Sequence, residues 1–129
     1  MNNDDRQILR LAVPSDMPGG LDAARSGHFG RSPSFTIVDV VDDVVVNAFA
    51  VPNPPHHKGD HCLAQVLMLG ENFVDVVIVA GIGRKPLLAC LQAGMRVFAG
   101  EDRATVREVV QAFVDVELVP VGNDATALH

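Results

Sequence analysis

The chain has 129 residues, of which 48% are hydrophobic and 20% are charged, and its formal net charge is −6. This length favours a single domain that buries roughly two thirds of its extended surface, with a core at about residues 8–119 and flexible tails at 1–7 and 120–129. The negative charge argues against nucleic acid as the main partner, and no apolar run approaches the ~20 residues that span a membrane. The two cysteines and the acidic, signal-free N-terminus predict a cytoplasmic protein.

The first half of the chain reads as three strands and one long loop. Residues 8–13 form an apolar run that we expect to be the first strand, ended by Pro14. The loop from Ser15 to Ser34 is long and rich in glycine, and loops of this length in compact domains are usually functional or disordered. The apolar runs 35–40 and 44–51 are separated by a short acidic turn, which predicts an antiparallel hairpin.

The second half alternates helices with strands. Residues Val76 to Val79 are all apolar and β-branched, a pattern typical of a strand buried on both faces. We expect further strands at 95–99 and, as a short edge strand, at 116–119. We expect the three helices to begin at the N-cap Asp60, at Pro86 and at the N-cap Asp102.

This order of elements predicts a three-layer α/β domain. If the strands at 8–13 and 44–51 flank the strand at 35–40 in a meander, they run parallel to each other and to the strand at 76–79. Their carboxyl ends then lie at one edge of the sheet, where open α/β sheets bind their ligands. We therefore expect three loops to converge at this edge: 14–33, 52–60 and 81–86.

The turn from Gly81 to Gly83 leads from the buried strand into a helix that begins near Pro86. Open N–H groups and the positive end of the helix dipole favour an anion at such a place. The alternative is a tight turn without a ligand, because Pro86 stands where the dinucleotide fingerprint needs its third glycine. Half of the ten basic residues fall in the loop segments 25–31, 56–62 and 81–86, with only one acid. These basic residues are Arg25, Arg31, Lys58, Arg84 and Lys85.

The same segments carry four of the five histidines and one of the two cysteines. These candidate metal ligands are His28, His56, His57, His61 and Cys62. Imidazole and thiolate bind zinc, copper and iron, but no spacing here matches a closed structural zinc site. In the plainer interpretation the histidines are solvated loop residues and Cys62 is a packing residue, as we expect for Cys90. Catalysis is the weaker hypothesis, because no nucleophile stands in a recognisable setting.

Three segments together resemble the dinitrogenase iron–molybdenum cofactor family, also called nitrogenase accessory factor-like proteins. They are Gly27-His28-Phe29-Gly30-Arg31-Ser32-Pro33-Ser34-Phe35, the run from Val76 to Gly83, and the run from Leu91 to Phe98. Their order and spacing are similar to the family over roughly residues 8–114. The resemblance implies a three-layer α/β/α ribonuclease H-like fold with a mixed five-stranded sheet whose second strand is antiparallel.

The resemblance also implies a non-enzymatic carrier or chaperone for iron–molybdenum cofactor, its precursor or another metal–sulfur cluster. Such clusters are anionic and bring their own sulfides, which suits the basic loops and the two cysteines. The implied ligand region maps to His28 and to the loop with His56, His57 and His61. The residues expected to contact the rest of the cofactor are Gly27, Phe29, Gly30, Arg31, Gly81, Gly83, Arg84 and Lys85.

The expected protein partner is a cluster-assembly or acceptor protein, with the chain itself a monomer or weak dimer. Two alternatives from other classes stay open. The turn at 81–86 also suits a nucleotide- or phosphate-binding regulatory module, and the histidines also suit a hydrolase with a His-bound metal.

Overall fold

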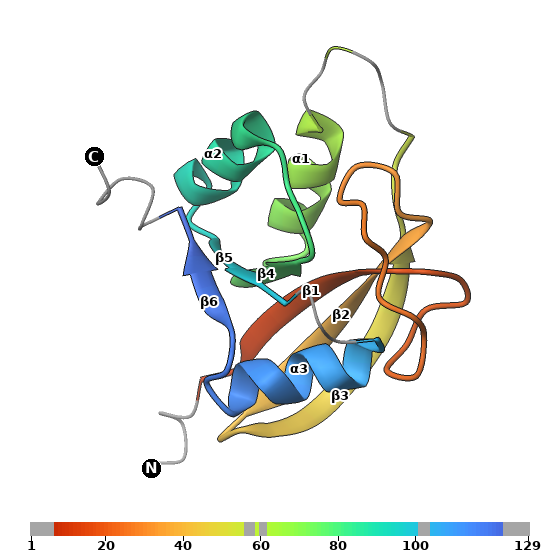
Figure 1. Cartoon of the computed structure of the whole chain (residues 1–129), viewed down its shortest axis with the longest axis vertical. Coiled ribbons are helices and arrows are strands. Elements are labelled where there is room, and N and C mark those ends of the chain that lie inside the picture. Colours follow the sequence, from red (N-terminus) through yellow and green to blue (C-terminus); the bar gives the residue numbers. More distant parts are fainter. Residues whose placement is uncertain (1–6, 56–58, 60–61, 101–103, 123–129) are drawn as a thin grey trace.

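The computed structural model describes residues 7–55, 59, 62–100 and 104–122. Within these ranges the chain forms nine elements, three of them helices (Figure 1). They are β1 (Leu9–Ser15), β2 (Ser34–Val41), β3 (Val44–Pro52), α1 (Leu63–Glu71), β4 (Val76–Val79), α2 (Arg84–Gln92), β5 (Arg96–Ala99), α3 (Val106–Val114) and β6 (Val119–Val121). No helix in these ranges is long and apolar enough to cross a membrane.

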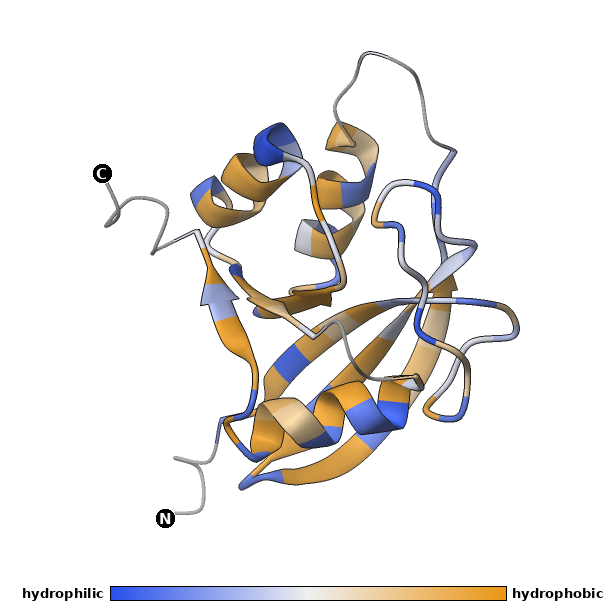
Figure 2. Cartoon of the chain, viewed as in Figure 1, coloured by the Kyte–Doolittle hydropathy of each residue, from blue (hydrophilic) through white to orange (hydrophobic). Residues whose placement is uncertain are grey.

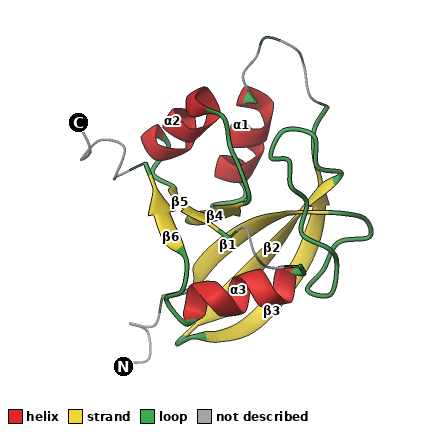
Figure 3. Cartoon of the chain, in the orientation of Figure 1, coloured by secondary structure: helices red, strands yellow, loops and turns green. Residues whose placement is uncertain are grey.

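The strands form one mixed sheet in the order β3-β2-β1-β4-β5-β6 (Figure 3). β2 runs antiparallel to both β1 and β3, whereas β4 runs parallel to β1 and β5. The prediction of a mixed sheet with an antiparallel second strand is therefore confirmed. The described sheet has six strands rather than five, because β6 adds an antiparallel edge to β5. The ribonuclease H-like assignment stays a prediction.

Two apolar cores lie on opposite faces of this sheet, which gives the three layers that the sequence predicted. Helices α1 and α2 cover one face and α3 covers the other (Figure 1). The strands β1 and β4 alternate between the cores: Val77 of β4 packs toward α1 and α2, and Val76 and Ile78 pack toward α3. Figure 2 shows β4 in the hydrophobic colour, as expected for a strand buried on both faces.

Two strands, β1 and β6, differ from the prediction by more than one residue at a boundary. Pro14 does not end β1 but lies inside it, opposite Phe35 of β2. The parallel pairing of β1 with β4 covers only Leu11 and Ala12, so the missing N–H of Pro14 falls beyond that ladder. The edge strand begins at Val119 rather than Val116, because Val116 has a positive φ of 61° and belongs to the turn that ends α3.

All three helix starts also differ from the prediction. The N-cap of α1 is Cys62 and that of α3 is Thr105; the predicted caps Asp60 and Asp102 lie outside the described residues. Thr105 forms a capping box with Glu108, which satisfies two backbone N–H groups reciprocally. Helix α2 begins at Arg84 after the N-cap Gly83, so Pro86 occupies its third position.

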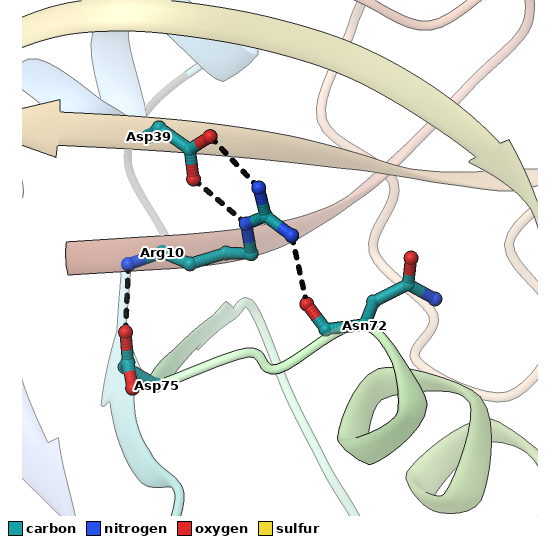
Figure 4. A network of polar contacts seen from close by, with 4 residues as sticks. All are labelled: Arg10, Asp39, Asn72 and Asp75. Carbon is teal, nitrogen blue, oxygen red and sulfur yellow. Dashed lines mark hydrogen bonds and ion pairs between the residues drawn. The ribbon is translucent and has the colours of Figure 1, made fainter. Parts of the chain in front are cut away.

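A partly buried ion pair joins β1 to β2 near the start of β1 (Figure 4). The Arg10 guanidinium on β1 donates to both carboxylate oxygens of Asp39 on β2, at 2.7 and 2.9 Å. Its third contact, 3.0 Å long, is to the carbonyl oxygen of Asn72 after α1. The Arg10 backbone N–H donates to the Asp75 carboxylate at 2.9 Å, just before β4 begins. One side chain therefore joins β1, β2 and the turn between α1 and β4.

We predict that Val77→Asp abolishes cooperative folding. Val77 is fully buried in β4, and an unpaired charge placed there costs several kcal/mol. Circular dichroism during denaturant titration checks this. Val44→Asp is the matched control, because Val44 is exposed at the start of β3 and should tolerate the charge. A cooperatively folded Val77→Asp protein would contradict the central placement of β4.

We also predict that Asp39→Asn lowers the free energy of unfolding at pH 7 by about 1.5–3 kcal/mol, the usual range for a hydrogen bond to a charged group. The hydrogen bonds from Arg10 lower the pKa of Asp39 below its ordinary value of 3.8. Because the folded pKa is the lower one, this stabilisation is present above about pH 5 and is lost as the pH falls through the folded pKa.

The urea midpoint, measured for both proteins between pH 7 and pH 2, checks this sign: the difference should shrink toward acid pH. Asp22→Asn is the control, because the Asp22–Arg107 ion pair is exposed and such pairs contribute little. A difference that stays constant down to pH 2 would contradict the role assigned to the Asp39 carboxylate.

Candidate functional site

A cavity of about 360 Å³ lies at the edge of the sheet where β1, β3 and β4 end, which we call the carboxyl edge. Its walls come from the loop after β1, the turn after β4 and the start of α1 (Figure 1). The lining residues are Gly27, His28, Phe29, Gly30, Arg31, Cys62, Gly81, Ile82, Gly83 and Pro86. From β1 the chain continues to β2 on one side, and from β4 it continues to β5 on the other. The cavity thus lies at a switch point of the sheet, where open α/β folds bind ligands.

The starts of two helices meet at this cavity. Cys62, the N-cap of α1, and Gly83, the N-cap of α2, both line it. Neither helix has a side-chain hydrogen bond at its cap, and neither has an acid in its first turn. By contrast, α3 on the opposite face has a complete capping box. The first N–H groups of a helix lack intrahelical partners and carry partial positive charge, so two such ends face the cavity.

Basic side chains add to this positive potential. Arg31 lines the cavity, and Arg84 and Lys85 are the exposed first two residues of α2. None of the ion pairs within the described residues involves these three side chains. Cations at a helix N-terminus are unfavourable by about 0.3–1 kcal/mol each, because they oppose the dipole. The arrangement therefore has a surplus of positive charge that an anion would neutralise.

The expected metal ligands divide into two groups. His28 is exposed at the cavity wall, where its backbone N–H donates to the Ser26 hydroxyl at 3.2 Å. The neighbouring Phe29 is buried and packs edge-on against Phe35, which anchors the loop that carries His28. His56, His57 and His61 lie outside the described residues, as does Lys58. In the part of the chain that is described, no three His, Cys, Asp or Glu side chains cluster as a metal site.

The two cysteines differ in environment. Cys62 is half-buried at the cavity wall and has a positive φ of 65°. Cys90 is fully buried in α2, and burial raises its pKa to about 12, with a smaller contribution from Cys62. Cys90 therefore remains a protonated core thiol, whereas Cys62 is a partly buried residue of the cavity wall.

Four residues near the cavity were not among those predicted from the sequence. Ile82 and Pro86 line it, and the helix-turn pattern around Gly81 and Gly83 could have indicated them. Asn53 and Gln65 lie behind the loop that carries His28 and Arg31, and hydrogen-bond to each other. Nothing in the local sequence pattern distinguishes these two polar residues, because their partners are far away along the chain.

The fold and the cavity define a small open α/β domain with a cavity at the carboxyl ends of two parallel strands. The chain belongs to the dinitrogenase iron-molybdenum cofactor family, whose sequence profile matches residues 9–116. No curated protein matches the chain.

Solved structures give the same fold. The apo form of the orange protein from Desulfovibrio gigas is 26% identical, with a TM-score of 0.79 over 90% of this chain and 95% of that one. A protein from Thermotoga provisionally named NifB is also 26% identical, with a TM-score of 0.71 over 88% of this chain and 93% of that one. A Methanocaldococcus jannaschii protein provisionally named a dinitrogenase has a TM-score of 0.71 over 90% of this chain and 97% of that one; at 15% identity it supports the fold alone.

We predict that only one thiol of the native protein reacts rapidly with Ellman's reagent. At pH 8 a thiol with a pKa of about 12 is ionised to an extent on the order of 10⁻⁴, and the thiolate is the reactive form. Cys62 should therefore account for the fast phase, and Cys62→Ser should abolish it. Both thiols should react in denaturant. Equal rates for the two thiols in the native protein would contradict the burial of Cys90.

Proposed function

We propose that this chain is a non-enzymatic carrier or chaperone that holds an anionic metal–sulfur cofactor of the iron–molybdenum type in the cavity at the carboxyl edge. The observation that carries the proposal is that two helix starts without a side-chain cap meet at one cavity, with Arg31 in its wall and Arg84 and Lys85 in the first turn of α2. The family to which the chain belongs, and the likeness to the orange protein and the NifB-type protein, support a small cofactor-binding role.

The first turn of α2 carries positive charge at the positive end of the helix dipole. Its first two residues, Arg84 and Lys85, oppose the helix dipole, and no acid or cap offsets them. A helix selected only for stability would have an acid or a capping side chain here, as α3 has. A bound anion reverses the sign of the interaction, because it is attracted by the dipole and by both cations. The unfavourable interaction of Arg84 and Lys85 with the dipole of α2 is therefore explained if an anion binds at this helix start.

The glycines of the cavity wall support the same proposal. Gly27 and Gly81 do not have a positive φ, and a Cβ at either position would meet open space within 4 Å. Neither backbone conformation nor packing therefore requires glycine at these two positions. A ligand that approaches backbone N–H groups closely does require it. Sulfide and oxide ligands of a cluster can accept hydrogen bonds from such groups.

The chain's own ligands would complete the site. Imidazole of His28 and the thiol of Cys62 are suited to iron, copper and related metals, and both residues line the cavity. The loop that carries His56, His57 and His61 leads into α1 next to Cys62 and supplies the remaining predicted ligands. A cluster brings its own sulfides, so a few protein ligands suffice. A carrier of this kind hands its cargo to an acceptor or assembly protein.

A second candidate is a regulatory module that binds a nucleotide or phosphate at the start of α2. The observation that favours it is the same uncapped helix start, since phosphate groups bind at such places on many folds. This candidate gives no role to His28 or Cys62. The two candidates therefore differ in which ligand binds and in which side chains matter.

Tetrathiomolybdate, a simple anion of molybdenum and sulfide with strong visible absorption, is the probe that tests the first candidate. We predict that it binds anaerobically and that Arg84→Gln/Lys85→Gln weakens binding about tenfold or more at low salt, as loss of charged hydrogen bonds implies. The thermal midpoint should stay unchanged or rise slightly, because two cations leave the positive end of α2. Equilibrium dialysis with absorption detection measures the affinity.

The matched control is Arg96→Gln/Arg107→Gln, which makes the same change in net charge away from the cavity. If both double variants weakened binding equally, the loss of affinity would result from net charge alone and not from the position of Arg84 and Lys85. His28→Ala, His61→Ala and Cys62→Ser then test metal contact through the visible spectrum of the bound probe. Tight binding of ATP or inorganic phosphate, with no uptake of tetrathiomolybdate, would overturn the first candidate in favour of the second.

A further inference from the structure

The side-chain amide of Asn53, just after β3, holds the loop that forms one wall of the cavity. Its Nδ2 lies 2.8 Å from the carbonyl oxygen of Ser32 and 3.2 Å from the Ser32 hydroxyl. It lies 3.4 and 3.3 Å from the carbonyl oxygens of Phe29 and Gly30. The Asn53 backbone N–H donates to the carbonyl oxygen of Pro33 at 3.2 Å. Asn53 therefore contacts the backbone carbonyl oxygens of four of the five residues in the 29–33 segment.

Gln65 in the first turn of α1 holds Asn53 in turn. Its Nε2 donates to the Asn53 side-chain oxygen at 3.1 Å and to the carbonyl oxygen of Pro54 at 2.9 Å. These contacts fix which way the Asn53 amide points, so that its NH₂ group faces the loop. Gln65 is fully buried, and its Oε1 has no hydrogen-bond partner within the described residues. An unpaired buried carbonyl oxygen lowers the stability of the fold, because it has lost its hydrogen bonds to water.

We infer that Asn53 and Gln65 are positioning residues for the cavity: Gln65 orients the Asn53 amide, and Asn53 fixes the 29–33 backbone in its binding shape. Asn53 lies between Pro52 and Pro54, whose fixed φ angles restrict the anchor before any ligand arrives. The unpaired oxygen of Gln65 supports this role, because an apolar side chain of the same shape would fill the site without that cost. The consequence for ligand affinity rests on the proposed function; the consequence for loop order does not.

A loop that is already ordered strengthens binding, because the loss of its conformational entropy does not accompany ligand binding. The loop carries His28 and Arg31 to the cavity, so its mobility would disperse both groups. The three segments that meet here, around residues 29–33, 53–54 and 65, come from the ends of different elements. Their hydrogen bonds therefore set the width of the cavity between the loop and the start of α1.

The first test is limited trypsin digestion of the native protein, read at two sites. Arg31 lies in the held loop, and Arg107 lies on α3 at the other face of the sheet. Asn53→Ala should speed cleavage after Arg31 about tenfold, the effect of losing hydrogen bonds that contribute roughly 1–1.5 kcal/mol, while cleavage after Arg107 stays at the wild-type rate. Unchanged cleavage after Arg31, or equal acceleration at both sites, would overturn the inference, because the latter indicates global destabilisation.

The second test separates positioning from stability. Gln65→Met removes the amide and its unpaired oxygen, so the thermal midpoint should stay the same or rise while cleavage after Arg31 becomes faster. The double variant Asn53→Ala/Gln65→Met should be cut no faster after Arg31 than Asn53→Ala alone, because Gln65 acts through Asn53. Additive acceleration would overturn this order of action. Asn72→Ala is the matched control, since it removes an amide hydrogen bond at the far end of α1 and should leave the Arg31 rate unchanged.

The third test measures the affinity of the same variants for tetrathiomolybdate. Asn53→Ala should weaken binding about as much as it loosens the loop, and Asn72→Ala should not. Faster cleavage with unchanged affinity would overturn the positioning role. If the wild-type protein itself takes up no tetrathiomolybdate, the proposed function fails and the role in ligand affinity fails with it, whereas the cleavage rates still decide whether Asn53 and Gln65 order the loop.

Discussion

β1 and β4 pair in parallel through Leu11 with Val76 and Ala12 with Val77, and the Arg10 network closes this short pairing at its amino end. Beyond Ala12 and Val77 the two strands no longer pair with each other, and they continue into the loop and the turn that form the cavity. The two ends of the strand pair thus differ: one is fastened by charge and hydrogen bonds, and the other is open. The position of the cavity follows from this asymmetry rather than from any single side chain.

The same strand directions explain why two helix starts meet. α1 connects β3 to β4 and α2 connects β4 to β5, and these three strands are parallel. A helix that joins two parallel strands begins at the carboxyl edge of the first one, so both helices direct their positive ends to that edge. The strand directions alone therefore create a positive electrostatic potential at this edge. The basic residues of the loops add to that potential, and the glycines leave backbone N–H groups accessible.

Much of the fold could be predicted because its strands are apolar runs bounded by turns, and because the acidic turn after β2 leaves room only for a hairpin. The helix starts were predicted wrongly: Asp60 and Asp102 are common capping residues, yet the signature that decided α3 was Thr105 with Glu108 three positions later. The prediction that the loops 14–33, 52–60 and 81–86 lie at one edge of the sheet needed only the directions of the strands. That His56, His57 and His61 bind a metal stays a prediction, because they lie outside the described residues.

Asn53 and Gln65 could not have been predicted, because they bond to each other's side chains and to backbone groups that are distant in sequence. Polar residues of this kind become informative only when burial and unpaired atoms are known, as for the Gln65 oxygen. The general lesson is that charges and glycines indicate where a ligand binds, whereas the residues that hold the binding loop in shape depend on tertiary contacts.

The outer strand β3 has an unpaired edge that could pair with a strand of another molecule. Its far edge pairs with no strand of the described chain, and Val44 and Val46 are exposed along it. Open apolar edges of this kind add to strands of other molecules unless charge keeps them apart. Asp42 and Asp43, at the turn beside these valines, supply such charge. Salt screens this repulsion, so these two carboxylates should protect the β3 edge less well at high ionic strength.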